Sequence, residues 1–191
     1  MPIEKIGDNK EKFIHPLFHR ETPKVNPIDF EIIKNRLNTI ANEMGAAVHS
    51  AAHSLIFSEA QDFACALFDC EGHLVGMGEF MPGLQGAMQN NLDGIIAAEG
   101  WEVFKEGDIL MSNDPLYGAC HPPDLVLFHP IYLEQEVIGI AGCTVHHIDM
   151  GGAAPISWYP LATDLYQEGI RFPPGTKLYE AGKLRKDILN I

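Results

Sequence analysis

The sequence predicts an α+β fold, in which a mixed sheet made of β-hairpins is packed by a long N-terminal helix and a second helix. Apolar residues recur at helical spacing from Asn26 to about Ala52 and again from Ala87 to Ala98. Other apolar runs are short and come in pairs separated by turn residues, which is typical of hairpins. With 46% apolar and 20% charged residues in 191, the chain can bury a core.

The first helix has a clear start signal. Asn26 is a good N-cap residue, Pro27 suits the first turn, and Asp29 adds a negative charge near the positive helix end. One face then carries Ile33, Leu37, Ile40, Met44 and Val48. This spacing predicts a single long amphipathic helix.

Five strands follow from the apolar runs and the turns between them. We expect hairpins of 64–68 with 74–77 and of 125–133 with 137–145, and a strand at 109–112. Further on, 162–169 could form a short helix, and 180–191 has the apolar spacing of another helix. Because that last pattern ends on apolar residues, we expect the tail to pack against a missing part of the chain or a partner.

Charge and composition restrict the class of function. The formal net charge of −13 makes binding to nucleic acid or to an anionic membrane unfavourable. The sequence has no apolar run of transmembrane length and no signal-peptide pattern. Its four cysteines form no CxxC pair, which favours reduced thiols and a cytoplasmic location. Residues 1–25 are predicted to form an N-terminal arm that docks on the domain or on a partner subunit.

His121 and Asp124 are candidate metal ligands. They lie three residues apart across Pro122 and Pro123, and the prolines hold an extended backbone that projects both side chains to one side. A rigid histidine and carboxylate suit a divalent ion with mixed nitrogen and oxygen ligands. The alternative interpretation is a proline-rich surface turn whose polar residues face water.

The second cluster, His146 to Gly152, follows a predicted strand. If strand alternation persists, His147 and Asp149 face one side and His146 the other, so that only one histidine meets His121 and Asp124. The other histidine would serve in acid–base chemistry or support a ligand. Gly151 and Gly152 allow close approach of a ligand to the backbone. The hairpin between the two clusters would bring them to the same end of the sheet.

Two further polar groups allow a structural or a functional interpretation. The Asn113-Asp114-Pro115 segment could cap a turn or orient a metal ligand. Asp164, Glu168 and Arg171 are more typical of a solvated helix face than of a catalytic set.

Together these motifs resemble the hydantoinase B family. The resemblance covers Asn26 to Ile191 and depends on four motifs in order, with further similarity at 62–69: Asn-Asp-Pro at 113–115, His-x-x-Asp at 121–124, His-His-x-Asp-x-Gly-Gly at 146–152, and Tyr-Gln-Glu-Gly-Ile-Arg-Phe-Pro-Pro at 166–174. The family includes 5-oxoprolinases, hydantoin-cleaving enzymes, and acetone and acetophenone carboxylases. Its members are several hundred residues long, so 26–191 would be the N-terminal part of a hydantoinase B-like catalytic domain.

The resemblance implies a catalytic subunit with a bound metal and a hydantoinase A-like partner that carries the ATP site. The chain itself has no GxxxxGK[ST] motif, in agreement with ATP being bound by a partner in a hetero-oligomer. The resemblance also implies that His121, Asp124 and one histidine of the 146–147 pair are the metal ligands, with Asp149 as ligand or neighbour. We assign His121, Asp124 and His146 to the metal, His147 and Asp149 to catalysis, and Gly151 and Gly152 to the substrate.

The expected function is therefore that of a metal-dependent catalytic subunit of an ATP-dependent hydrolase. Its substrate would be a cyclic amide such as a hydantoin, oxoproline or lactam. Zinc, iron or manganese suits the mixed ligands better than magnesium or calcium. The alternatives are the catalytic subunit of an ATP-dependent ketone carboxylase and a non-catalytic assembly subunit.

Overall fold

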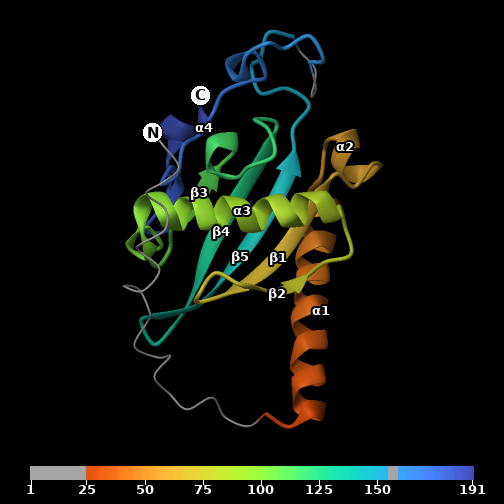
Figure 1. Ribbon diagram of the computed structural model, residues 1–191, viewed down its shortest axis with the longest axis vertical. Coiled ribbons are helices and arrows are strands. Elements are labelled where there is room, and N and C mark those ends of the chain that lie inside the picture. The colour runs from red at the N-terminus through yellow and green to blue at the C-terminus, as the bar shows by residue number, and fades with distance from the viewer. Residues whose placement is uncertain (1–24, 155–158) are drawn as a thin grey trace.

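The computed structural model describes residues 25–154 and 159–191, so almost the whole predicted N-terminal arm lies outside the described residues. Figure 1 shows a sheet with helices packed against it. The helices are α1 (Pro27–Ala51), α2 (Leu55–Ser58), α3 (Pro82–Glu99) and α4 (Lys186–Leu189), with short 3-10 helices η3 (Trp101–Val103), η4 (Pro115–Tyr117) and η5 (Leu165–Gln167). The strands are β1 (Phe63–Asp69), β2 (Leu74–Met77), β3 (Ile109–Ser112), β4 (Asp124–Leu133), β5 (Glu136–His146), β6 (Lys177–Glu180) and β7 (Lys183–Leu184).

The predicted α+β class is confirmed, but the sheet is antiparallel and not mixed. Its seven strands follow the order β2-β1-β5-β4-β3-β6-β7, and each neighbouring pair is antiparallel. Helix α3 connects β2 to β3, and these two strands run in the same direction. Three other strands lie between them, however, so this crossover creates no parallel pair.

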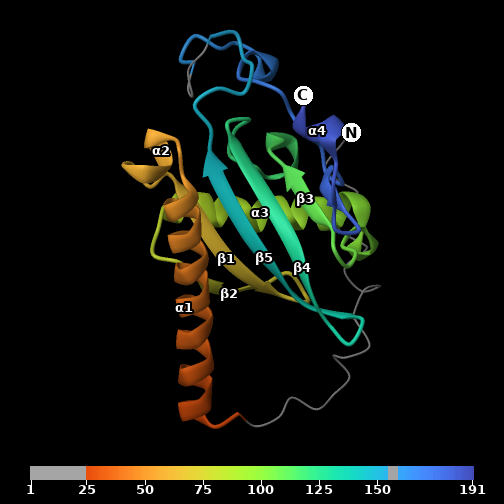
Figure 2. The same ribbon diagram turned by 180° about the vertical axis from the view of Figure 1, so that it is seen from behind.

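Both long helices pack on the sheet. Helix α1 begins where the sequence predicts, whereas α3 begins at Pro82, five residues before the predicted start at Ala87. The Asn26 side chain accepts a hydrogen bond from the backbone N–H of Ile28 at 3.0 Å, which caps α1. Helix α1 packs against β2 and β1, where Gly76 leaves room for Leu37. Helix α3 crosses the sheet and lies in front of it in Figure 1 and behind it in Figure 2.

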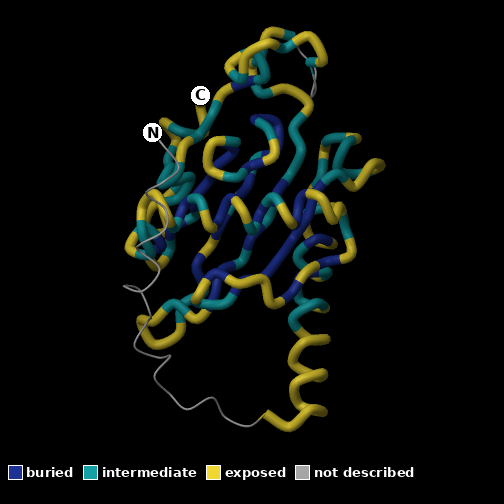
Figure 3. Tube along the Cα trace, in the orientation of Figure 1, coloured by how far each residue is buried: buried dark blue, intermediate teal, exposed yellow. Residues whose placement is uncertain are grey.

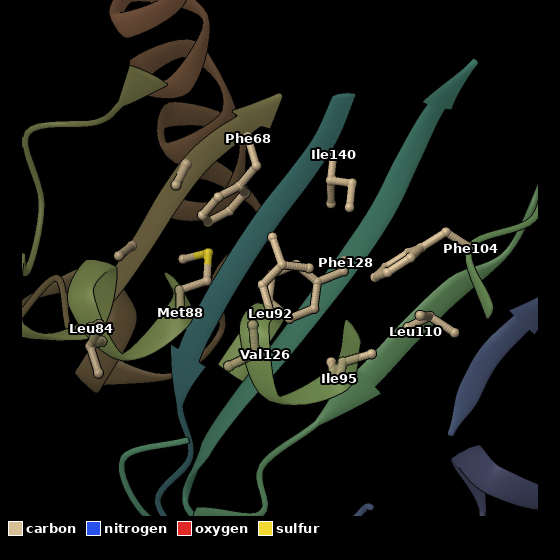
Figure 4. Packing of buried hydrophobic residues seen from close by; sticks show 12 residues of the cluster. Phe68, Leu84, Met88, Leu92, Ile95, Phe104, Leu110, Val126, Phe128 and Ile140 are labelled. Atoms are coloured by element: carbon tan, nitrogen blue, oxygen red, sulfur yellow. The ribbon is translucent and has the colours of Figure 1, made fainter. Parts of the chain in front are cut away.

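The hydrophobic core lies between α3 and the sheet, as Figure 4 shows. Met88, Leu92 and Ile95 of α3 are completely buried there against Phe128 and Ile140 of the sheet. By contrast, the N-terminal half of α1 extends beyond the sheet and is exposed (Figure 3).

The β4–β5 hairpin is the element that positions the candidate site. Its two-residue turn uses Glu134 and Gln135, both at positive φ, and its register pairs Leu133 with Glu136 at the turn. At the open end of the hairpin the same register pairs Asp124, the first residue of β4, with His146, the last residue of β5. The two sequences that carry the candidate ligands therefore meet at one end of the sheet, as the predicted hairpin requires.

The C-terminal segment differs from its predicted helix. Residues 177–180 and 183–184 form the hairpin of β6 and β7 at the sheet edge next to β3, and only Lys186–Leu189 is helical. The turn residues Ala181 and Gly182 both have positive φ, which a helix cannot accommodate. Leu189 and Ile191 remain exposed in this chain. Among the described helices, none combines the length and the apolar character needed to cross a bilayer.

Candidate metal centre

His121, Asp124 and His146 converge at the open end of the β4–β5 hairpin. His121 precedes β4 by three residues, and its carbonyl accepts a hydrogen bond from the N–H of Asp124 at 2.9 Å, which closes the His-Pro-Pro-Asp turn. The N–H of His146 in turn donates to the carbonyl of Asp62, next to β1, at 3.1 Å. Backbone hydrogen bonds thus fix the positions from which the three side chains project.

The two histidines contact different oxygens of the Asp124 carboxylate. His146 Nδ1 lies 2.6 Å from Oδ1, and His121 Nε2 lies 3.2 Å from Oδ2. The two imidazole rings are stacked with centroids 5.0 Å apart. The Asp124 side chain is only 4% exposed, that of His146 11%, and that of His121 25%, so the cluster opens to solvent on the His121 side.

Hydrogen bonds within the cluster stabilise the ionised form of Asp124 and the protonated form of His146. Burial alone would raise the pKa of Asp124, but hydrogen bonds from His121 and His146 outweigh it and hold that pKa below its usual range. The hydrogen bond to Asp124 raises the pKa of His146, against the opposing effect of burial. His147 behaves differently, because burial lowers its pKa and the neighbouring His146 adds to that effect.

The donor set fits a divalent ion. Two imidazole nitrogens and one carboxylate oxygen lie within 4.8 Å of one another, close enough for a single cation to bind all three. Mixed nitrogen and oxygen donors favour zinc, iron or manganese over magnesium or calcium. With three protein ligands and one side open to solvent, such a centre keeps a coordination position for water or substrate, as catalytic sites do.

Asn113 holds the His-Pro-Pro-Asp turn in place. This side chain is completely buried. Its amide nitrogen donates to the carbonyls of Pro122 at 2.6 Å and Ile170 at 2.9 Å, and its amide oxygen accepts from the N–H of Phe172 at 2.6 Å. Asn113 therefore connects the His-Pro-Pro-Asp turn to residues 170–172, which agrees with an orienting role for this motif.

Asp114, its neighbour, has the turn-capping role. Its Oδ1 accepts from the N–H of Leu116 at 3.0 Å and caps η4, and the same oxygen lies 3.6 Å from Nη1 of Arg171. The Arg171 guanidinium also packs over the Tyr166 ring. The Asn-Asp-Pro motif and the motif at 166–174 thus contact each other at two points beside the cluster.

The four other residues assigned from the sequence lie on the segment that leaves β5. The N–H of His147 donates to the carbonyl of Pro123 at 2.8 Å, and its ring packs edge-on against Phe57. Within 25–154 and 159–191, its buried Nε2 has no hydrogen-bond partner. Asp149 is exposed and accepts from the N–H of Gly151 at 2.8 Å. Neither His147 nor Asp149 belongs to the three-residue cluster, and their catalytic roles remain predictions.

Gly152 has a packing reason for lacking a side chain. A Cβ at this position would lie 2.6 Å from the carbonyl oxygen of Gln167, so no larger residue fits. Gly151 has a positive φ of 73°, which also favours glycine. These contacts fold the segment after β5 against 167–168; a role in substrate binding stays a prediction.

Glu168 also lies beside the cluster, although the sequence pattern does not predict it there. Its Oε2 lies 3.8 Å from Nδ1 of His121, on the opposite side of the ring from Asp124, and its side chain is only 27% exposed. Its spacing with Asp164 and Arg171 indicated a solvated face. The only sequence signal for it is its position inside the motif at 166–174, since no periodicity places that loop against His121.

Comparisons with known proteins agree with the resemblance seen in the motifs. The profile of the Hydantoinase B/oxoprolinase family matches residues 26–191. The B-type chain of a putative D-/L-hydantoinase from a Pseudomonas strain is 32% identical over 177 residues, which are 91% of this chain and 30% of that protein.

Two solved structures resemble the fold. The ATP-dependent caprolactamase of Pseudomonas jessenii matches with a TM-score of 0.78 and 30% identity, over 87% of this chain and 28% of that one. A nucleotide-free acetone carboxylase matches with a TM-score of 0.79 over 86% of this chain and 22% of that one; at 24% identity this likeness shows the fold alone. The chain spans less than a third of the length of these relatives. The match of the family profile to 26–191 shows that the chain belongs to the hydantoinase B/oxoprolinase family.

Proposed function

We propose that this chain is the N-terminal part of a metal-dependent catalytic subunit that opens cyclic amides in an ATP-dependent reaction. The observation that carries this proposal is the convergence of His121, Asp124 and His146 at the open end of the β4–β5 hairpin. Support comes from relatives described as a putative hydantoinase subunit and as an ATP-dependent caprolactamase, whose names denote cyclic-amide hydrolysis. The substrate would be a hydantoin, oxoproline or lactam ring.

The three side chains of the cluster would hold a zinc, iron or manganese ion. When bound, such an ion supplies Lewis-acid chemistry, which polarises a carbonyl group or lowers the pKa of a water molecule. The chain's own contribution is to orient the ligands. Because Asp124 is buried and both of its oxygens face histidines, a ligand set held in this way needs little rearrangement to bind the ion.

His147 is the proposed general base. Burial lowers its pKa, so its imidazole is neutral near pH 7 and able to accept a proton. Its Nε2 has no hydrogen-bond partner within the described part of the chain. In the tautomer that carries its proton on Nδ1, Nε2 would be the nitrogen that accepts a proton. Asp149 would assist in moving the proton, although in this conformation one of its oxygens accepts from Gly151. Gly151 and Gly152 would border the substrate, since neither has a side chain to obstruct it.

ATP would bind to a hydantoinase A-like partner, because the chain has no phosphate-binding loop motif of its own. The caprolactamase relative is named as a β subunit, which supports assembly with a second kind of chain. We propose that the two chains form a hetero-oligomer in the cytoplasm. In that assembly, the partner would activate the substrate and the present chain would hold the metal.

The test is metal analysis of the purified complex, followed by turnover assays with ATP. We expect about one divalent ion per chain, and ring opening of at least one compound from a panel of hydantoins, 5-oxoproline and lactams. Asp124→Ala should lose both metal and turnover. His73→Ala is the matched control, because His73 is an exposed histidine with acidic neighbours far from the cluster in sequence.

Each alternative has its own result in the same assays. Bicarbonate consumption that depends on a ketone and ATP, without cyclic-amide turnover, would replace the hydrolase by a carboxylase. A stable complex that binds no metal and turns over neither substrate class would identify an assembly subunit. Full metal content in Asp124→Ala would overturn the assignment of the centre.

A further inference from the structure

We propose that Glu168 is a positioning residue: its carboxylate, now at ion-pair distance from Nδ1 of His121, accepts the N–H of that nitrogen when the metal binds and holds the imidazole in its metal-binding orientation. This inference rests on the proposed metal centre. It assigns a role to a carboxylate outside the cluster whose spacing in the sequence is typical of a solvated face.

The geometry places His121 between two carboxylates. Its Nε2 lies 3.2 Å from Oδ2 of Asp124, and its Nδ1 lies 3.8 Å from Oε2 of Glu168. A neutral imidazole that presents Nε2 to a metal carries its proton on Nδ1. A carboxylate that accepts this proton fixes the tautomer and the ring orientation and makes the histidine a stronger ligand. Glu168 is on the side of the ring where that acceptor is needed.

The backbone around Glu168 is held on both sides. Before it, the carbonyl of Gln167 accepts from the N–H of Ala153 at 2.8 Å. After it, the N–H of Ile170 donates to the carbonyl of Met150 at 2.8 Å. Glu168 itself ends η5, where its N–H donates to the carbonyl of Leu165 at 3.1 Å. These bonds attach the Glu168 loop to the segment that leaves β5.

Asn113 closes the same arrangement from the other side. Its amide group donates to Pro122, next to His121, and to Ile170, two residues after Glu168. The two partners of the proposed hydrogen bond are therefore linked through one fully buried side chain. An acid on an unattached surface loop would have neither this connection nor a side chain that is only 27% exposed.

Glu168 does not fit the role of a fourth ligand. The ligand atoms of His121, Asp124 and His146 lie together within 4.8 Å, and the Glu168 carboxylate is not part of that group. It instead faces the ring nitrogen of His121 that points away from Asp124. Its contribution would thus pass through His121.

The experiment compares metal binding by the intact protein and by the variants Glu168→Gln and Glu168→Ala. Zn²⁺ affinity is measured by competition with a chromophoric chelator, and the ligand field is measured from the visible absorption of the Co²⁺-loaded protein. We expect Glu168→Ala to bind Zn²⁺ roughly 10- to 100-fold more weakly, the usual effect of losing such a partner. Glu168→Gln should lose less, because its amide oxygen still accepts a hydrogen bond. Both should alter the Co²⁺ absorption.

Asp164→Asn is the matched control on the same loop. Asp164 caps η5 through the N–H of Tyr166 at 2.9 Å, and asparagine keeps that acceptor while the negative charge is lost. We expect its Zn²⁺ affinity and Co²⁺ spectrum to match those of the unaltered protein. This comparison separates the contact with His121 from a general effect of charge on the loop.

The possible failures are distinguishable. If the unaltered protein binds no Zn²⁺, the proposed metal centre is wrong and the role of Glu168 is wrong with it. If Zn²⁺ binds and His121→Ala weakens it, but Glu168→Ala does not, only the positioning role is overturned. A loss of affinity that is equal in Glu168→Gln and Glu168→Ala, with an unchanged Co²⁺ spectrum, would also overturn it.

Discussion

Asp124 is almost completely buried and yet ionised, because each of its carboxylate oxygens faces a histidine. An unpaired carboxylate at this depth would be costly, so the histidines and the acid depend on one another. His147, the next residue after His146, is half-buried; its buried Nε2 has no such partner among the described residues, and its pKa moves in the opposite direction. Two adjacent histidines therefore differ in their protonation chemistry.

This difference predicts opposite pH dependences of stability in the metal-free protein. The pKa of His146 is raised above its ordinary 6.5 by the hydrogen bond to Asp124. The folded state thus binds that proton more tightly than the unfolded state, and the stabilisation is fully present below pH 6.5 and lost as the pH rises through the raised value. The stability advantage of the unaltered protein over His146→Gln should therefore shrink as the pH rises above 6.5.

His147→Gln is the control of opposite sign. Burial lowers the pKa of His147 below 6.5, so the contribution of its neutral ring is present above pH 6.5 and lost as the pH falls through the lowered value. The measurement is urea unfolding at several pH values in the presence of a chelator. Parallel pH profiles for the two variants would contradict the assignment of the two histidines to different environments.

At the scale of the elements, the site depends on contacts between segments that are far apart in the sequence. Asn113, at the end of β3, hydrogen-bonds Pro122 before β4 and residues 170–172 before β6. We expect Asn113→Ala to lower the free energy of unfolding by about 1–3 kcal/mol, even if only one buried partner is left unsatisfied. The variant should also bind metal more weakly, because the turn that carries His121 is loosened. Urea midpoints and Zn²⁺ titrations measure the two effects.

The exposed Asn35 of α1 provides the comparison for Asn113. Asn35→Ala should change the free energy of unfolding by no more than about 0.5 kcal/mol, since exposed substitutions of this kind usually do. If Asn113→Ala were as mild as Asn35→Ala, the buried amide would not be holding the two loops together.

A second prediction at this scale concerns the contact of α3 with η4. A Cβ at Gly94 would collide with the carbonyl oxygen of Tyr117, whereas a Cβ at Gly86 of the same helix would meet nothing within 4 Å. Gly94→Ala should destabilise the protein by about 1–3 kcal/mol, because the backbone of η4 must move. Gly86→Ala should stabilise it by up to about 1 kcal/mol through helix propensity. Thermal unfolding of both variants tests the pair; equal effects would refute the close contact.

The sequence predicts these elements unevenly, for physical reasons. The β4–β5 hairpin, and the convergence of His121 and Asp124 with one histidine of the 146–147 pair, follow from local signals, namely rigid prolines, alternating strands and a short turn. Strand β7 is not predictable from such local signals. Leu184, Ile188 and Leu189 have helical spacing, but Leu184 belongs to β7, and only the other two lie in helix α4. The pairing of β6 with β3 joins residues about 70 positions apart, which no local pattern records.

The position of Glu168 beside His121 cannot be predicted either, because it also depends on contacts between distant segments. Glu168 reaches His121 through hydrogen bonds of 150–153 with 167–170, and those bonds depend on Gly152 leaving space for the Gln167 carbonyl. Two adjacent glycines in a sequence indicate room for the backbone without indicating what fills it. Here the loop that carries Glu168 fills the space at Gly152.

The whole molecule has two distinct ends. The candidate centre lies where β5 ends and β4 begins, whereas α1 starts at the opposite end (Figure 1). Near that start, Ile28, Phe30, Ile32 and Ile33 are each more than half exposed. Apolar surface of this kind is typical of a region that packs against another protein segment. The formal net charge of −13 also favours the approach of a cation.

Metal binding should stabilise the entire fold, because the cluster joins β4, β5 and the turn before β4, and folding of these parts is coupled through the central sheet. An ion that binds only the folded state at 100 times its dissociation constant adds about 2.7 kcal/mol to the free energy of unfolding. For a chain of this length, that corresponds to a rise in Tm of roughly 5–10 °C. Differential scanning calorimetry with and without Zn²⁺ measures the shift.

Two variants make the measurement specific to the centre. Asp124→Ala removes the carboxylate that both histidines face, so its Tm should not respond to Zn²⁺. Asp149→Asn alters a nearby acid that lies outside the cluster and is engaged with Gly151, and its Tm should rise with Zn²⁺ as in the unaltered protein. A Zn²⁺ response that survives in Asp124→Ala would place the ion elsewhere in the molecule. A response that disappears in Asp149→Asn would instead make Asp149 a ligand, the other role that the family resemblance allows for this residue.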